Sequence, residues 1–200
     1  MDDLYKEYVI SYFDRTVEIH GDRPEALRWS TPGQKLHYEC LLDVAPDLCG
    51  KILDYGCGKG DLYDFLANRG LQVEYTGCDI NSRLIEMARE KHPGCSFHVF
   101  DVEEEDLHED FDYIFLVGVF NLKVDGLGKT IKNVLKKLFG HCRKALAFNA
   151  LSAHCPVKSY ELNYLHPEEF FKFAVQELSP YVTLRHDKIF HDFFLFIYVR

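Results

Sequence analysis

The most informative segment of the chain is Ile52-Leu53-Asp54-Tyr55-Gly56-Cys57-Gly58-Lys59-Gly60-Asp61. A short apolar run ends near an acidic residue, three glycines follow at every second position, and a helical apolar pattern comes next. A strand that turns through glycines into a helix brings bare backbone close to a ligand. The segment therefore predicts the opening of an α/β unit with a nucleotide-like ligand beside its first turn.

The glycine spacing separates two cofactor classes. A dinucleotide-binding turn needs G-x-G-x-x-G/A, and counting from Gly56 places Asp61 at the last position. The pattern present is D-x-G-x-G-x-G, which begins at Asp54 and resembles the first motif of class I S-adenosylmethionine (SAM) dependent methyltransferases. The resemblance implies that Gly56, Cys57 and Gly58 line the cofactor and that Asp54 compensates the charge of its methionyl amine.

From residue 51 onward the chain alternates apolar strand patterns with amphipathic helix patterns, which is typical of a parallel sheet. Two strands close the chain, and this resembles the antiparallel addition of class I methyltransferases. The resemblance implies a Rossmann-like, doubly wound α/β sheet of seven strands, in the order 3-2-1-4-5-7-6 with the last strand antiparallel. Strands are expected at 51–55, 73–78, 96–100, 111–117, 144–148, 182–185 and 193–199, and helices at 61–68, 82–91, 127–139 and 167–177.

One domain of residues 1–200 is expected, with a core at 50–200. The segment 1–46 contains a helical pattern at 4–20, a loop at 21–33 and a second helix at 34–44. This resembles the N-terminal helical cap that many small-molecule methyltransferases place over the active site. The resemblance makes Trp29 and Tyr12 candidates for substrate contact, although Tyr12 fits ordinary packing equally well.

Acidic residues lie at the ends of three successive predicted strands, where ligands of doubly wound sheets bind. Asp54 lies near the end of the first strand, Asp79 at the end of the second and Asp101 at the end of the third. By resemblance to the family's later motifs, Asp79 accepts hydrogen bonds from the ribose hydroxyls. Ile80 packs against the adenine, Asp101 accepts from the adenine amino group, and the Val102 amide lies beside it.

The exit of the fourth strand indicates the type of acceptor. It reads Val117-Gly118-Val119-Phe120-Asn121-Leu122, without the (D/N)-P-P-(Y/F) motif that amino methyltransferases of bases or glutamine often carry. The segment resembles the small-molecule branch, in which Val117 runs along the cofactor and Phe120 and Asn121 face the acceptor. Phe120 fits a place in the core equally well, and Asn149, after the fifth strand, is a further candidate for substrate contact.

Two histidines are candidate general bases for an alcohol or phenol acceptor: His154, after the fifth strand, and His37, in the second helix. For each, an ordinary surface or packing role is the competing interpretation. No metal is expected, because the histidines at 154, 166, 186 and 191 are scattered along the chain.

Composition indicates which binding partners and which cellular compartment to expect. The net charge of −9 argues against a non-specific grip on nucleic acid, and the basic residues between 129 and 144 fit a solvated helix face. The seven cysteines show no C-x-x-C spacing. With neither a signal-peptide pattern nor an apolar run of roughly 18 residues, a soluble cytoplasmic protein is expected.

These observations predict an enzyme that transfers the methyl group of SAM to oxygen or nitrogen of a small metabolite by in-line displacement, leaving S-adenosylhomocysteine. Two alternatives stay open: a methyltransferase of RNA or protein, and a catalytically silent SAM-binding module that regulates a partner. The sequence does not indicate the acceptor or the oligomeric state.

Overall fold

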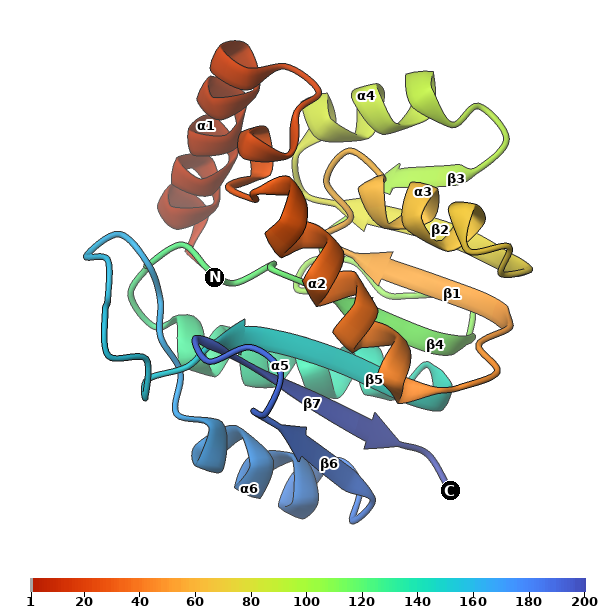
Figure 1. Cartoon of the computed structure of the whole chain (residues 1–200), viewed down its shortest axis with the longest axis vertical. Helices are drawn as coiled ribbons and strands as arrows, with labels where there is room; N and C mark the ends of the chain where they lie inside the picture. The colour runs from red at the N-terminus through yellow and green to blue at the C-terminus, as the bar shows by residue number, and fades with distance from the viewer. Residues whose placement is uncertain (1) are drawn as a thin grey trace. The chain divides into compact units, whose positions relative to one another are not determined.

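A computed structural model describes residues 2–200 of the chain (Figure 1). Its seven strands form one sheet in the order β3-β2-β1-β4-β5-β7-β6, which confirms the predicted order. The chain divides into two compact units, an N-terminal unit that ends at Asp101 and a C-terminal unit that begins at Val102. The prediction of a single domain stays a prediction.

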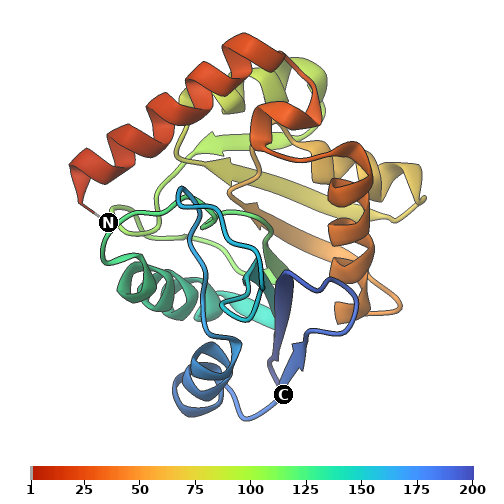
Figure 2. The same cartoon turned by 60° about the vertical axis from the view of Figure 1, so that its left-hand side comes forward.

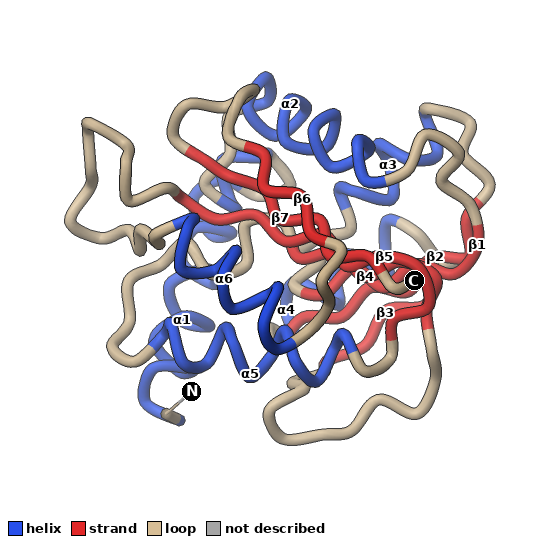
Figure 3. Tube along the Cα trace, turned by 90° about the horizontal axis from the view of Figure 1, so that it is seen from below, coloured by secondary structure: helices blue, strands red, loops and turns tan. Residues whose placement is uncertain are grey.

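The N-terminal unit contains three parallel strands, in which β2 pairs with both β1 and β3. The carboxyl ends of β1 and β2 lie together, since Tyr55 is aligned with Cys78. Helix α4 packs on β2 and β3, and α2 lies beside α3 (Figure 3). The elements are α1 (Asp3–His20), η1 (Pro24–Leu27), α2 (Thr31–Leu41), η2 (Leu42–Val44), β1 (Gly50–Tyr55), α3 (Asp61–Asn68), β2 (Val73–Asp79), α4 (Ser82–Lys91) and β3 (Ser96–Val99).

The cap segment differs from its prediction at its second helix. The loop ends at Ser30, and α2 begins at Thr31 rather than residue 34, because the Ser30 hydroxyl accepts a hydrogen bond from the Gly33 amide at 3.2 Å. Pro32 in the first turn fits this start, because an amide there needs no helical partner. A short 3-10 turn, η1, lies inside the predicted loop.

Helix α1 is anchored within its own unit. It packs along η1, as Figure 2 shows, and its buried Val17 lies in an apolar cluster with Ala26 and Leu84 of α4. The Asn81 side chain, which caps α4, donates to Asp14 of α1 at 2.9 Å. The cap is thus attached to the segment that follows β2.

In the C-terminal unit, β4 and β5 are parallel, and β7 runs antiparallel to both β5 and β6. Strand β7 lies between β5 and β6, and its residues 192–197 are buried, which explains why its sequence is almost wholly apolar. Helix α5 packs on β5, and α6 on β6 and β7. The elements are β4 (Phe111–Leu116), α5 (Leu127–Phe139), β5 (Cys142–Leu151), α6 (Pro167–Glu177), β6 (Val182–Arg185) and β7 (Asp192–Tyr198).

Strand β5 is longer than predicted, ten residues rather than five. Its extension is stabilised by pairing with β7, which continues to Leu151 opposite Asp192. No helix among residues 2–200 has the length and apolar character needed to cross a membrane.

Candidate active site

The glycine turn after β1 is held against the end of β2. The amides of Gly56 and Cys57 both donate to the Cys78 carbonyl, at 2.7 and 3.0 Å. The next amide, that of Gly58, donates to the Asp79 carboxylate at 2.9 Å. Two neighbouring strand ends and the turn therefore form one hydrogen-bonded unit.

Glycine is favoured at position 58 by its backbone conformation. Its φ of +54° lies in the left-handed region, and a Cβ built there would come within 2.6 Å of the Leu27 side chain. Leu27 belongs to η1, so the cap segment approaches the turn directly. Leu27 was not predicted from the sequence, because it is an ordinary leucine in a stretch predicted to be a loop.

Asp79 is half-buried at the end of β2, as expected for a ligand-binding carboxylate. Its second oxygen accepts from the Asn81 amide at 2.9 Å. Burial raises the pKa of Asp79, while the amides of Asn81, Gly58 and Ile80 act in the opposite direction. A carboxylate offers about four acceptor positions, so both oxygens retain capacity for further donors.

Asp54 lies deeper, with only 3% of its surface exposed. The Tyr75 hydroxyl donates to it at 2.5 Å. Burial, against which the Tyr75 hydrogen bond acts, raises the pKa of Asp54 to about 7, and the nearby Asp79 charge adds to the increase. The structure therefore brings Asp54 and Asp79 together, as predicted, and adds Tyr75, which nothing in the sequence indicated.

Asp101 has a cationic partner that the sequence analysis did not identify. Lys6 of α1 lies 2.6 Å from its carboxylate, and both side chains are largely buried. Ile80 is half-buried beside Asp79. The roles of Asp101 and Ile80 toward an adenine stay predictions.

The cap residues occupy different environments. The Tyr12 hydroxyl accepts a hydrogen bond from Arg28 at 2.5 Å, and the Trp29 ring packs against His37 at 4.6 Å between centroids. His37 is 3% exposed, and its Nδ1 lies 2.7 Å from the Gly33 carbonyl. An Nδ1–H that donates to this carbonyl places the lone pair of the neutral ring on Nε2.

In the C-terminal unit, Asn149 holds the exit of β4 in place. Its side-chain oxygen accepts from the Gly118 amide at 2.7 Å, and its nitrogen donates to Asp192 at 2.8 Å. With 1% of Asn149 exposed, its geometry is that of a positioning residue rather than the predicted substrate contact. Val117 is half-buried, and the carbonyl of the buried Val102 accepts a hydrogen bond from Lys137.

Phe120 and Asn121, the two predicted acceptor contacts after β4, have different surroundings. Phe120 is 7% exposed and packs against Phe148, which is the core position that the sequence left open. Asn121 has a buried side-chain oxygen with no hydrogen-bond partner among residues 2–200. Because an unpaired buried acceptor costs about 1–3 kcal/mol, this oxygen is a candidate for contact with a bound molecule that donates a hydrogen bond.

His154, the other predicted base, is more than half exposed, and its Nε2 lies 2.9 Å from Glu168 of α6.

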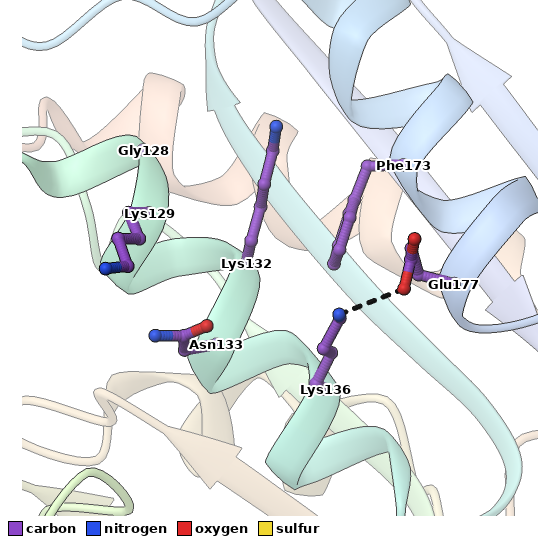
Figure 4. A pocket seen from close by; sticks show the side chains of 7 residues that line it. All are labelled: Gly128, Lys129, Lys132, Asn133, Lys136, Phe173 and Glu177. Atoms are coloured by element: carbon purple, nitrogen blue, oxygen red, sulfur yellow. Dashed lines mark hydrogen bonds and ion pairs between the residues drawn. The ribbon is translucent and has the colours of Figure 1, made fainter.

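The predicted helix face of basic residues is partly paired, since Lys136 bonds Glu177 and lies 5.7 Å from the Phe173 ring centre. A surface cavity of about 390 Å³ is lined by Lys136, Glu177 and Phe173 together with Lys132 and its neighbours on α5 (Figure 4). None of the predicted site residues lines this cavity.

Comparisons with known proteins define the class. Residues 52–144 match the family described as a methyltransferase domain. Together with the strand order and the acidic strand ends, this identifies the chain as a class I SAM-dependent methyltransferase. The predicted family and enzyme class are thus confirmed.

Individual proteins resemble the chain to different extents. The chain is 27% identical to the Mycobacterium tuberculosis protein Rv1506c, which is named as a methyltransferase. The 152 aligned residues cover 73% of this chain and 91% of that protein. The ribosomal RNA small subunit methyltransferase C of Vibrio parahaemolyticus is 28% identical over 73% of this chain but only 42% of its own length. The SAM-bound crystal structure of magnesium protoporphyrin IX methyltransferase from Synechocystis has a TM-score of 0.65 at 16% identity and covers 100% of this chain and 98% of its own.

The cofactor is SAM, and the residues of the N-terminal unit fit it. Asp79 retains acceptor capacity on both oxygens, which suits a pair of ribose hydroxyls. The positive φ of Gly58 favours glycine, so no side chain covers the backbone on which the cofactor would lie. The buried Asp54 supplies negative charge once it ionises, which suits a methionyl ammonium group.

Proposed function

We propose that the chain transfers the methyl group of SAM to an oxygen or nitrogen atom of a small metabolite. The observation that carries this proposal is the unpaired buried oxygen of Asn121, just beyond β4. Such an oxygen is satisfied by an O–H or N–H donor, so it favours an acceptor that carries one.

Two further observations support a small acceptor rather than RNA. The net charge of −9 disfavours a polyphosphate surface, and the exit of β4 lacks the motif typical of base amino methyltransferases. The full-length likeness to an enzyme named for a porphyrin substrate agrees with this, whereas the rRNA enzyme is matched over less than half its length.

The mechanism needs positioning more than activation. When bound, SAM supplies a methyl group that is already activated as a sulfonium, so in-line approach of the acceptor sets the rate. In this proposal Asp79 and the glycine turn hold the nucleoside, Asp54 holds the methionyl end, and Asn149 keeps the turn at Gly118 in place. Ile80, Asp101 and Val102 complete the cofactor contacts, and Val117 lies along the cofactor.

His37 is our choice of base for acceptors that must lose a proton. It is buried, its Nδ1 is fixed by the Gly33 carbonyl, and its Nε2 is then free of a proton in the neutral ring. His154 is the alternative, but its exposed ring is engaged with Glu168. Tyr12 and Trp29 contribute aromatic faces on the acceptor side of this proposal.

The test uses methyl-labelled SAM incubated with the enzyme and, separately, with the small-molecule filtrate, the RNA and the protein of a cell extract. We expect label in the filtrate, with much less transferred by Asp79→Asn at the same SAM concentration. Label confined to RNA would replace this proposal with the RNA alternative, and label confined to protein would likewise contradict it. No transfer to any fraction, with SAM still bound, would favour the silent binding module.

A further inference from the structure

Two imidazoles and one carboxylate converge on the surface of the C-terminal unit. His154 follows β5, His166 immediately precedes α6, and Glu168 lies in the first turn of that helix. The two carboxylate oxygens of Glu168 face one imidazole each: Nε2 of His154 is 2.9 Å from one, and Nδ1 of His166 is 3.2 Å from the other. These histidines are scattered along the sequence, and the fold brings them together.

The separations suit a single metal ion. One ligand atom from each of the three residues lies within 4.8 Å of the other two. Zinc binds imidazole nitrogen and carboxylate oxygen at about 2.0–2.2 Å, so tetrahedral ligands are about 3.4 Å apart. The two His–Glu separations are close to this value already, and a small rotation of exposed rings brings the third into range.

The chemistry of the set also suits a metal. Two imidazoles and one carboxylate are a donor set that zinc accepts with an open position for water. All three side chains are 55–58% exposed, so an ion can reach them from solvent.

A third imidazole stands next to the set. The ring of His186, in the connection between β6 and β7, lies 6.5 Å from that of His154 at an interplanar angle of 82°. It is exposed and free of the steric limits of a core residue. His186 is therefore placed to become a fourth ligand in the position otherwise held by water.

We propose that His154, His166 and Glu168 form a surface binding site for one divalent transition-metal ion of the zinc and nickel class. This goes beyond the methyl transfer and does not depend on it. The ion would link the beginning of the long loop that follows β5 to the first turn of α6, where that loop ends (Figure 1).

Isothermal calorimetry with Ni²⁺ tests the site, on the full chain without a polyhistidine tag. Nickel is chosen because imidazole suits it, whereas soft metals would seek the exposed thiol of Cys49. We expect one ion per chain, and at least a ten-fold loss of affinity in His166→Ala and in Glu168→Gln. His186→Ala should show a smaller loss, and Zn²⁺ should compete with Ni²⁺.

The matched control is His141→Ala. His141 pairs with a single acid, Asp110, at 3.3 Å, so it tests whether any surface His–carboxylate pair binds nickel. We expect this variant to bind like the parent chain. Absence of saturable binding, or equal affinities in His166→Ala, Glu168→Gln and the parent, would overturn the proposal, as would an equal loss in His141→Ala. Far-UV circular dichroism without metal verifies that each exposed substitution leaves the fold intact.

Discussion

At the scale of single residues, Asp54 and Asp79 lie on adjacent strands but in different environments. Asp79 is half-buried and holds two backbone amides, whereas Asp54 is buried and holds a tyrosine hydroxyl. Their environments give them different protonation behaviour, because burial raises the pKa of Asp54 to about 7. The proton on Asp54 is therefore exchanged near neutral pH.

We predict that SAM binding near pH 6.5 releases a proton from Asp54. A methionyl ammonium group favours the ionised carboxylate, so binding lowers the pKa of Asp54 below the solution pH. Calorimetry in buffers of different ionisation enthalpy measures the released proton. In Asp54→Asn the release should disappear and the affinity should lose its rise between pH 6 and 8, and a release that persists in this variant would contradict the assignment.

The same pKa makes a prediction about stability. Its folded value of about 7 lies above the ordinary 3.8, so the folded protein binds this proton more tightly than the unfolded chain. The contribution of Asp54 to stability is complete below about pH 4 and is lost as the pH rises through 7, at about 1.4 kcal/mol per unit. Urea unfolding from pH 4 to 8 should show the free energy of unfolding of Asp54→Asn rising relative to that of the parent chain. Curves that stay parallel would argue against a raised pKa.

Asp79 is predicted to be the main determinant of cofactor affinity. Asp79→Ala removes the ribose acceptor and the anchor for the Gly58 amide, and we expect SAM affinity to fall more than ten-fold. Equilibrium dialysis with labelled SAM measures this loss. Asp47→Asn, which neutralises an exposed acid instead, should leave the affinity unchanged, and equal affinities in all three proteins would refute the role of Asp79.

At the scale of elements, a buried lysine ties the cap to the glycine turn. Lys59 lies within the glycine motif and is fully buried, and its ammonium group bonds both Asp22, after α1, and Asp61, at the start of α3. Burial alone would raise the pKa of Asp61, but Lys59 and Lys91 outweigh it and lower the pKa. The network joins three segments of the N-terminal unit.

Lys59→Met should therefore destabilise the protein strongly. Removing one partner of a buried ion pair costs up to about 3–5 kcal/mol, and Lys91, which still pairs with Asp22 and Asp61, compensates only part of that loss. Lys51→Met is the matched control, because Lys51 forms an exposed pair with Glu74 that is worth at most about 1 kcal/mol. Chemical unfolding of both variants measures the difference, and similar losses would show that the Lys59 network is no more than a surface pair.

At the scale of the whole molecule, charge determines which partners can associate. The net charge of −9 repels a phosphate backbone, and the basic side chains of the C-terminal unit are partly engaged with acids, carbonyls and aromatic rings. Four of the six basic residues noted in the sequence, at 136, 137, 143 and 144, have such acidic or carbonyl partners. Of the six, those at 129, 132, 136 and 137 lie on α5 and those at 143 and 144 lie on β5, so the predicted helix face includes only four of them.

We accordingly predict no binding of single-stranded RNA by the enzyme at about 0.15 M salt. Non-specific binders reach dissociation constants of about 10⁻⁴–10⁻⁶ M under such conditions, so affinity should fall short of this range. Fluorescence anisotropy with a labelled oligonucleotide, repeated at several salt concentrations, measures it. Saturable micromolar binding with a steep salt dependence would contradict the prediction and support an RNA acceptor.

The sequence by itself determined the order of the elements, the glycine turn and the acids at the strand ends. These features depend on local periodicity, backbone conformation and spacing, all of which are written in contiguous residues. Only the tertiary structure revealed that Tyr75 bonds Asp54, that Lys6 bonds Asp101, and that Asn149 is buried. It alone brought His154 and His166 to one carboxylate, because such contacts join residues through packing between elements, which no local pattern encodes.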